Sequence, residues 1–228
     1  MDAIILAGGK GTRMDNTVPK PLVMVGDKPI IQHQIDYLLG KVDRIVVSTG
    51  YMAERVEKFV QGLYPRFSDG KYCKSEIYFS RENKELGTAG GLKKALNMTV
   101  MNEVIAFNCD DLTDIPISRL EHIAENTICV ANPTLSFGSV EIGEDGYVSS
   151  FREKEKLKDF WISCGWYKFM VNNKFYDSLP EKGMLEFDVF PKMRLKPYFH
   201  TGFWKAINTR KDVDEFNKMP KSYQAASL

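Results

Sequence analysis

The sequence predicts an α/β protein built on a doubly wound, mixed sheet. Along residues 1–132, short apolar segments alternate with segments whose apolar residues recur at helical spacing. The connections between these segments are short, which is typical of β-α-β units and of a mostly parallel sheet. Glycine-rich and acidic motifs directly follow the expected strands, and the ligands of such sheets bind at the carboxyl ends of the strands.

The elements of the first half follow from these two periodicities. Residues 3–6 (A-I-I-L) form an uninterrupted apolar run, as expected for a strand buried on both faces. Residues 53–63 place Val56, Phe59 and Val60 on one face of a helix. We expect strands over residues 3–6, 44–49, 75–80, 103–108 and 127–131, and helices over residues 30–39, 53–63, 88–96 and 117–124.

The pattern changes after about residue 135, where a G-E-D-G turn at residues 143–146 predicts a hairpin. We expect a single domain over residues 1–220, with a parallel half (1–132), a more antiparallel half (133–220) in the same sheet, and a tail (221–228). The expected strands of the second half are residues 136–142, 147–153, 161–171, 196–200 and 204–207, and its expected helices are 172–179, 185–193 and 210–219.

Composition excludes several classes of protein. The chain has 228 residues, with 31 basic against 30 acidic ones, whereas nucleic-acid-binding domains usually carry a basic excess. The apolar N-terminal run is too short for a signal peptide, and no other stretch approaches the length of a membrane span. We therefore expect a cytoplasmic protein without nucleic-acid or membrane partners. The cysteines form no C-x-x-C pair, which argues against a disulfide framework or a zinc site, and they are Cys73, Cys109, Cys129 and Cys164.

The strongest motif follows the first expected strand and reads A-G-G-K-G-T-R over residues 7–13. Its glycines let the backbone approach a ligand, and Arg13 adds a fork of donors suited to phosphate oxygens. The motif lacks the G-K-S/T of a Walker A loop, and Met14 stands at the last glycine of a dinucleotide fingerprint. By itself, such a loop is equally typical of a flexible turn.

A second motif, P-K-P-L at residues 19–22, changes this balance. Proline restricts both its own backbone and that of its neighbour, so we expect Lys20 to be held in an extended, rigid segment. A lysine fixed shortly after an arginine loop suits a triphosphate. The alternative is an exposed loop lysine, which is the commoner fate of a single lysine.

Together, G-G-x-G-T-R and P-K-P-L resemble the N-terminal signature of the sugar-1-phosphate nucleotidyltransferases. The resemblance continues in order to about residue 216. It implies a Rossmann-like nucleotide-binding half (1–132) and a sugar-phosphate-binding half (133–220). It also implies a reaction in which a nucleoside triphosphate and a sugar 1-phosphate give an NDP-sugar and pyrophosphate, with Mg²⁺ as the cofactor. Relatives often form oligomers, so a homo-oligomer is possible.

The resemblance assigns the nucleotide to the glycine loop and to L-G-T-A-G-G at residues 86–91, which in the family lies beside the base. It gives Arg13 to the leaving pyrophosphate and Lys20 to the triphosphate, both as catalytic residues. Thr88 has the alternative role of helix N-cap. The implied nucleotide-binding residues are Leu6, Ala7, Gly8, Gly9, Gly11, Thr12, Arg13, Glu82, Gly87 and Thr88.

Asp110, in N-C-D after the fourth expected strand, is implied as the catalytic metal ligand, and a carboxylate suits a hard cation. Asp111 and Asp114 are lesser candidates, and Asp114 fits a helix cap better. Many relatives carry a second metal-binding aspartate in W-x-D-I-G-T, where this chain has Ala206. The cytidylyltransferase variant has its acid two places later, which is Asn208 here, an amide oxygen without charge.

F-R-E-K at residues 151–154 matches the family's sugar motif. The resemblance assigns Glu153 to sugar hydroxyls and Lys154, a further catalytic residue, to the sugar phosphate. Without the resemblance, the alternating charges over residues 154–158 would indicate only a solvent-exposed face. The implied substrate-binding residues are Asp110, Gly138, Glu153, Lys154, Ser163, Gly165 and Glu186.

The expected mechanism is in-line displacement at the α-phosphorus, which needs positioning and charge neutralisation but no protein nucleophile. The segment that runs from Glu82 through L-G-T-A-G most resembles the mannose- or heptose-1-phosphate guanylyltransferases, which implies GTP with mannose or heptose 1-phosphate. The G-F-W segment at residues 202–204 leaves thymidylyl, uridylyl or cytidylyl transfer to glucose 1-phosphate open. Further alternatives are CMP transfer to a non-sugar phosphate and a catalytically weak, nucleotide-sugar-binding homologue.

Overall fold

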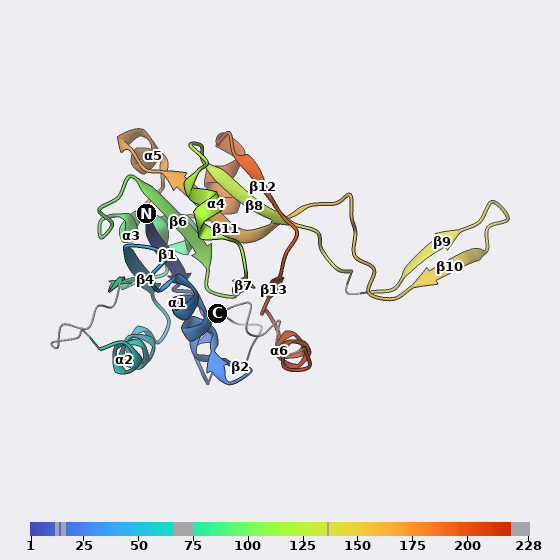
Figure 1. Cartoon of the computed structure of the whole chain (residues 1–228), viewed down its shortest axis with the longest axis horizontal. Helices are drawn as coiled ribbons and strands as arrows, with labels where there is room; N and C mark the ends of the chain where they lie inside the picture. Colours follow the sequence, from blue (N-terminus) through green and yellow to red (C-terminus); the bar gives the residue numbers. More distant parts are fainter. Residues whose placement is uncertain (12–13, 15–16, 66–74, 136, 220–228) are drawn as a thin grey trace.

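The protein is built around a seven-stranded sheet with the strand order β12-β8-β11-β6-β1-β4-β5 (Figure 1). The structure is a computed structural model that describes residues 1–11, 14, 17–65, 75–135 and 137–219. The strands of the sheet are β1 (Asp2–Ala7), β4 (Arg44–Thr49), β5 (Glu76–Arg81), β6 (Glu103–Asn108), β8 (Thr127–Ala131), β11 (Ile162–Met170) and β12 (Lys196–His200).

The sheet is mixed, as predicted. Strand β1 pairs in parallel with β4 and β6, and β4 pairs in parallel with β5. Strand β11 runs antiparallel to both of its neighbours, β6 and β8. Strand β12 passes beyond β11 and pairs in parallel with β8. The strands that end at the motifs therefore all point the same way.

Helices cover both faces of the sheet, so the fold is doubly wound. Successive residues of β1 point to opposite faces, so Ile5 packs with α1 (Ile30–Leu38) and Ile4 with α3 (Gly87–Leu96). The first face also receives α2, α4 and α6, and the second receives α5. The bounds of the remaining helices are α2 (Ala53–Leu63), α4 (Ile117–Glu121), α5 (Asn173–Ser178) and α6 (Arg210–Asn217).

Several boundaries differ from the sequence-based expectation for identifiable reasons. Helix α4 ends at Glu121 rather than near residue 124, because the buried Lys168 of β11 donates to the carbonyl oxygens of Glu121 and Ile123 at 3.2 and 2.6 Å. These hydrogen bonds replace the continuation of the helix. The expected helix over residues 185–193 is instead a π-helical turn, η2 (Leu185–Val189), followed by a 3₁₀ turn, η3 (Phe190–Lys192).

Short elements that the sequence did not predict bring the motifs together. Strand β7 (Asp111–Thr113) follows β6 and pairs with β13 (Trp204–Ala206), so that Ala206 lies opposite Asp111. A 3₁₀ turn, η1 (Lys20–Leu22), precedes the small β2 (Met24–Val25) and β3 (Lys28–Pro29) hairpin. The β7–β13 pair carries the C-terminal part of the chain back to the end of β6.

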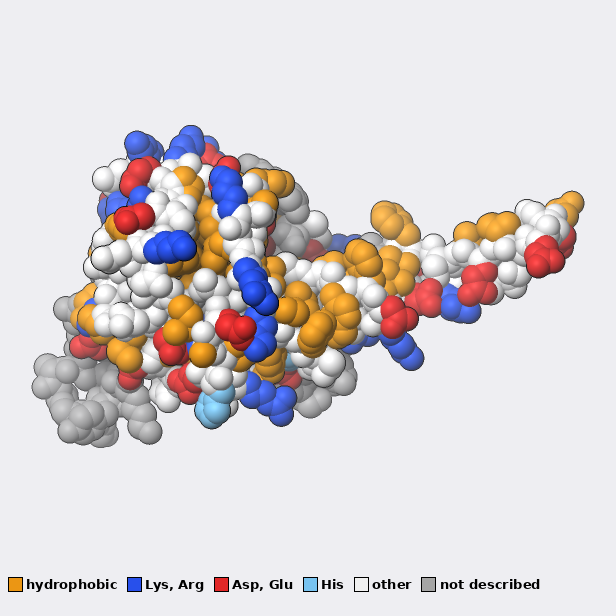
Figure 2. Space-filling model, turned by 90° about the horizontal axis from the view of Figure 1, so that it is seen from above, with side chains coloured by type: hydrophobic (Ala, Val, Ile, Leu, Met, Phe, Trp, Pro, Cys, Tyr) orange, Lys and Arg blue, Asp and Glu red, His pale blue; other side chains and the backbone are white. Residues whose placement is uncertain are grey.

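The predicted hairpin is present and consists of β9 (Ser139–Ile142) and β10 (Val148–Arg152). It projects far from the body of the molecule, as Figures 1 and 2 both show. Its turn uses Gly146 at φ +81°, and the Asp145 carboxylate accepts a hydrogen bond from the Tyr147 amide at 3.1 Å. Within the described residues, no helix is long and apolar enough to cross a membrane.

Gly165 in β11 yields a test of packing. Its φ of +73° lies in the left-handed region, and an added Cβ would stand 1.9 Å from the Asp111 Oδ2 atom. We expect Gly165→Ala to lower the free energy of unfolding by about 2–4 kcal/mol, since left-handed strain and overpacking add. Gly146→Ala shares the positive φ but meets nothing within 4 Å, so it should cost only the left-handed strain of about 1–2 kcal/mol. Urea unfolding measures both, and equal costs would contradict the packing argument.

Candidate active site

The candidate site lies where β1, β4, β5 and β6 end. The glycine loop follows β1, Gly50 follows β4, Glu82 follows β5 and Asp110 follows β6. Because these four strands are parallel, their carboxyl ends meet at one edge of the sheet. The sheet thus assembles motifs that are separated by up to a hundred residues along the chain.

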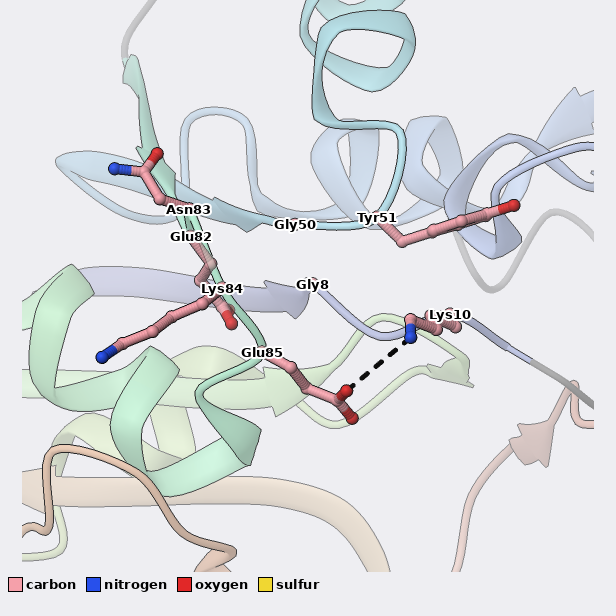
Figure 3. Close-up of a pocket in the computed structure, with 8 residues that line it drawn as sticks. All are labelled: Gly8, Lys10, Gly50, Tyr51, Glu82, Asn83, Lys84 and Glu85. Atoms are coloured by element: carbon pink, nitrogen blue, oxygen red, sulfur yellow. Dashed lines mark ion pairs between the residues drawn. The ribbon is translucent and has the colours of Figure 1, made fainter.

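A pocket of about 170 Å³ opens at this edge (Figure 3). Two glycines give it its shape. A Cβ on Gly8 would stand 2.4 Å from the Glu82 Oε1 atom, and a Cβ on Gly50 would stand 2.6 Å from the Gly8 carbonyl oxygen. The Tyr51 amide donates to the same Gly8 oxygen at 3.0 Å. The pocket is lined by Gly8, Lys10, Gly50, Tyr51, Glu82, Asn83, Lys84 and Glu85.

The Glu82 carboxylate is held in one orientation at the pocket. The Ser48 hydroxyl donates to Oε1 at 2.9 Å, and the Leu86 amide donates to Oε2 at 3.2 Å. Gly91 of α3 leaves room on the other side, since its added Cβ would approach Oε1 to 2.8 Å. A carboxylate oxygen has two lone pairs and can accept more than one hydrogen bond.

The segment at Gly87 and Thr88 joins the two halves of the site. Helix α3 begins at Gly87 with Leu86 as its N-cap, so the alternative role of Thr88 as an N-cap is wrong. The Thr88 hydroxyl instead accepts from the Leu185 amide at 2.8 Å and donates to the Glu186 carboxylate at 3.1 Å. A predicted nucleotide-binding residue and a predicted sugar-binding residue therefore touch each other.

Lys20, Asp110 and Asn208 converge on one point. The Lys20 ammonium forms an ion pair with Asp110 Oδ2 and donates to Asn208 Oδ1 at 3.2 Å. The expected extended conformation of Lys20 is wrong, because the Leu22 amide bonds to the Pro19 carbonyl at 2.8 Å and closes a 3₁₀ turn. Only Pro19 itself is extended. The turn still presents the lysine to the end of β6.

The backbone holds these oxygen donors in register. The Ile207 amide donates to the Asp110 carbonyl at 2.8 Å, and the Asn208 amide donates to Asp212 Oδ2 at 3.0 Å. A carboxylate and an amide oxygen that both face one cation are the donor types that a hard divalent ion takes. The described residues hold no cluster of three or more His, Cys, Asp or Glu side chains arranged for a metal. The Asp110 and Asn208 oxygens are thus the donors that fit a hard divalent ion at this point.

Asp111 is a buried acid directly behind this point. Trp204 Nε1 donates to its Oδ1 at 3.0 Å, and Asn108 Nδ2 lies 3.4 Å from its Oδ2. Burial, and then the neighbouring charge of Asp110, raise the pKa of the Asp111 carboxyl well above its ordinary value. The oxygens of Asp111 already have hydrogen-bond partners, which is a physical reason to rank Asp111 below Asp110 as a metal ligand.

Asp114 is not a helix cap, contrary to the expectation. Pro116 stands at the N-cap position of α4. The Asp114 carboxylate instead lies 2.9 Å from His200 Nε2 and accepts from the Phe203 amide at 2.8 Å. These contacts tie the end of β12 to β7 and so support the β7–β13 pair.

Several predicted sugar-binding residues contact another predicted residue, and Gly138 and Glu153 do so where the β9–β10 hairpin begins and ends. Gly138 lies beside Glu153, since an added Cβ would stand 3.1 Å from Glu153 Oε2. The Gly165 amide donates to the Ser163 hydroxyl at 3.3 Å, and Glu186 contacts Thr88. The structure thus places each of these residues next to another member of the predicted set.

Lys154 is held by a residue that sequence reasoning missed. Its ammonium lies 3.4 Å from Glu215 Oε1 on α6, while the Lys205 ammonium lies 2.6 Å from Glu215 Oε2. Lys154 also has a φ of +54°, which is rare for a lysine and is typical of strained functional positions. Nothing in the local sequence connects residues 154, 205 and 215, because the contact depends on how α6 docks.

Two of the predicted residues, Thr12 and Arg13, lie outside the described residues, as does Cys73. The roles of Thr12 and Arg13 therefore stay predictions. Leu6 and Ala7 end β1, and the Leu6 carbonyl accepts from the Cys109 amide at 3.1 Å. Gly9 is exposed at the pocket end of the loop, where an added Cβ would meet nothing within 4 Å.

The family model described as "Nucleotidyl transferase" matches residues 2–193. The chain belongs to this family. A "Probable glucose-1-phosphate cytidylyltransferase" of Bacillus subtilis is 30% identical, with 96% of each chain covered. The "D-glycero-alpha-D-manno-heptose 1-phosphate guanylyltransferase" of Campylobacter jejuni is 32% identical, with 82% of this chain and 83% of that protein covered.

The fold of this nucleotidyl transferase also matches solved structures. HddC from Yersinia pseudotuberculosis, complexed with GMP-PN, superimposes with a TM-score of 0.69 at 25% identity, covering 95% of this chain and 98% of that one. The resemblance drawn from the G-G-x-G-T-R and P-K-P-L motifs is confirmed by the family match, and the predicted fold class is confirmed by the sheet and its neighbours.

Gly50 offers a test of the pocket. Gly50→Ala places a methyl group against the backbone of Gly8, so the loop must move away from Glu82. We expect about 1–3 kcal/mol lower stability and nucleoside triphosphate binding weakened by roughly tenfold or more. Calorimetric titration and urea unfolding measure the two effects. Gly62→Ala in α2 meets nothing within 4 Å and should leave binding unchanged; equal binding by both variants would refute the role of Gly50.

Proposed function

We propose that the protein transfers GMP from GTP to mannose 1-phosphate or heptose 1-phosphate, forming a GDP-sugar and pyrophosphate. The observation that carries the choice of nucleotide is the carboxylate of Glu82, which two hydrogen bonds hold at the pocket and which can only accept further hydrogen bonds. The transfer itself is supported by the family match and by the convergence of Lys20, Asp110 and Asn208.

The hydrogen-bond donors and acceptors on the pairing edge of the base distinguish the nucleotides. Guanine presents two adjacent donors, N1–H and the N2 amino group, which pair with the two oxygens of a carboxylate. Uracil and thymine present one donor between two carbonyl oxygens, and cytosine presents one donor beside an acceptor. A carboxylate only accepts hydrogen bonds, so an acceptor on the base opposite Glu82 would repel it. Guanine is therefore the base that Glu82 fits.

The remaining residues act on phosphates by charge and position. In-line attack by the sugar phosphate on the α-phosphorus builds negative charge on the leaving pyrophosphate. We assign Arg13 to the neutralisation of that charge. Lys20 would leave its ion pair with Asp110 and bind the triphosphate instead. Lys154 orients the attacking phosphate. This phosphate competes with the Glu215 carboxylate for the Lys154 ammonium. No protein nucleophile is required, because the acceptor phosphate itself attacks.

Asp110 and Asn208 would hold Mg²⁺, since their oxygens already face a common cation. The bound ion would supply charge neutralisation at the phosphate oxygens. Because Asn208 is neutral, the protein supplies one negative charge here rather than two. The affinity for the ion should consequently be modest without nucleotide.

The relatives support more than one nucleotide. The Campylobacter jejuni protein is named a guanylyltransferase, and HddC was solved with GMP-PN. The Bacillus subtilis protein, which matches over 96% of its length, is named a probable cytidylyltransferase. Together with the G-F-W segment before Lys205, this favours CTP with glucose 1-phosphate as the second candidate.

Pyrophosphate release with each of GTP, CTP, UTP and dTTP, against mannose, heptose and glucose 1-phosphates, tests the proposal. We expect GTP to be preferred. In Glu82→Gln, kcat/KM for GTP should fall by roughly 100-fold, and the preference should move toward UTP or dTTP, since the amide offers a donor as well as an acceptor.

Glu85→Gln is the matched control, because Glu85 lines the same pocket but is largely exposed and contacts Lys10 at 3.9 Å. An unchanged GTP preference in Glu82→Gln would remove Glu82 from base recognition. A preference of the wild type for CTP would move the assignment to the second candidate. If no pair of substrates gives a product, the remaining interpretation is a nucleotide-sugar-binding homologue.

The metal assignment has its own test. Asn208→Asp restores a second carboxylate, so we expect the Mg²⁺ concentration for half-maximal activity to fall by about tenfold. Titration of Mn²⁺ by electron paramagnetic resonance should show the same tightening without turnover. Asn97→Asp adds equal charge on an exposed part of α3's end and should change neither quantity. Identical metal affinity in Asn208→Asp and the wild type would exclude residue 208 from the metal site.

A further inference from the structure

Lys154 has an unusual backbone for a residue that is expected to bind a phosphate. Its φ of +54° lies in the left-handed region, which residues with a Cβ seldom adopt. Such a conformation persists where the surroundings determine it. The Lys154 side chain is 61% exposed, so burial does not fix its ammonium. The orientation of the ammonium must therefore come from its charged contacts.

Glu215 of α6 contacts two lysines, one with each carboxylate oxygen. The Lys205 ammonium lies 2.6 Å from Oε2, whereas the Lys154 ammonium lies 3.4 Å from Oε1. The Lys205 side chain is only 18% exposed, so its ion pair is less screened by solvent than that of Lys154. The hydrogen bond from Lys205 is the main cause that lowers the pKa of the Glu215 carboxyl; burial opposes it, and Lys154 adds a smaller lowering. Glu215 is thus an anion with one strong partner and one weak partner.

The first turn of α6 fixes the place of Glu215. Thr209 is the N-cap, and the Asp212 Oδ2 atom accepts hydrogen bonds from the Asn208 and Thr209 amides at 3.0 and 2.7 Å. Asp212 and Glu215 are three residues apart and share a face of the helix, where both contact Lys205. The capping box therefore ties the position of Glu215 to that of Asn208.

The two lysines compete for the charge of Glu215. Glu215 keeps its contact with Lys205 whether or not Lys154 is bound, and the Lys205 charge reduces the attraction between Glu215 and Lys154. A phosphate can therefore draw the Lys154 ammonium away without leaving the carboxylate unpaired. If Lys205 carried no charge, Lys154 would be the one remaining lysine that pairs with Glu215 in the described part of the chain.

We propose that Glu215 is a positioning residue for the Lys154 ammonium, and that Lys205 limits how tightly Glu215 holds it. The inference rests on the proposed function, because it takes the phosphate of the sugar 1-phosphate as the ligand of Lys154. Glu215 orients the ammonium in the free protein, and the arriving phosphate replaces Glu215. The charges of Glu215 and Lys205 therefore act in opposite directions on the binding of the sugar 1-phosphate.

Glu215→Gln tests the positioning. The amide keeps the shape of the side chain but not its charge, so Lys154 is no longer held back from the phosphate. We expect KM for the sugar 1-phosphate to fall by about two- to fivefold, the range of an exposed ion pair. We expect kcat to fall by about fivefold, because the ammonium is less well aligned. Asp214→Asn is the matched control, since Asp214 is exposed on the same helix and has no ion pair within the described residues, and it should change neither constant.

Lys205→Met should change KM in the other direction. Glu215 then holds Lys154 more tightly, so we expect KM for the sugar 1-phosphate to rise by about two- to fivefold. Adding Glu215→Gln to Lys205→Met should abolish this rise, because Lys205 acts through Glu215. A cluster with only a structural role would raise KM in both single variants. Circular dichroism and the thermal midpoint show that each variant is folded.

Calorimetric titration with mannose 1-phosphate and glucose 1-phosphate, in the presence of Mg²⁺ and a non-hydrolysable GTP analogue, measures the same effects without turnover. Opposite shifts of Kd in the two single variants would support the proposal. Shifts in one direction, or no shift, in variants that still form product would overturn the role of Glu215 and leave the transfer reaction standing. A wild type that binds neither sugar phosphate and forms no product would overturn the proposed function, and this inference with it.

Discussion

The site depends on one electrostatic contact, the Lys20 ammonium held between the Asp110 carboxylate and the Asn208 amide oxygen. These residues come from the two ends and the middle of the chain. They meet because β7 and β13 pair, and because the Ile207 amide bonds to the Asp110 carbonyl. When a triphosphate binds, its phosphates would replace the Asp110 carboxylate as the partner of the Lys20 ammonium. Until then, the charges of the unliganded site stay paired with each other.

The two halves of the fold are coupled through side chains rather than through the sheet alone. Thr88 at the start of α3 bonds to both the backbone and the carboxylate of η2, through Leu185 and Glu186. On the other side, α6 carries Asp212, which bonds to Asn208, and Glu215, which holds Lys154. Movement of α6 would therefore act on the cation site and on Lys154 together, which suits a reaction whose two substrates must be aligned.

Close approaches at glycines explain much of the geometry. Gly8 and Gly91 leave the space that the Glu82 carboxylate fills, and Gly165 leaves the space that Asp111 fills. In each case, a polar side chain lies against backbone at a distance that no Cβ permits. The polar side chains are consequently held by packing as well as by hydrogen bonds, and such preorganisation favours selective recognition.

The sequence by itself determined the family, the order of most strands and helices, and the motifs that end at one sheet edge, because periodicity and glycine placement are local properties. It misplaced the conformation of Lys20, and the helix-cap alternatives for Thr88 and Asp114 do not hold. Only the tertiary structure decided that Asn208 faces the same cation as Asp110, that Glu215 holds Lys154, and that the hairpin stands clear of the body. These features depend on contacts between residues far apart in the chain, whose energies no local pattern records.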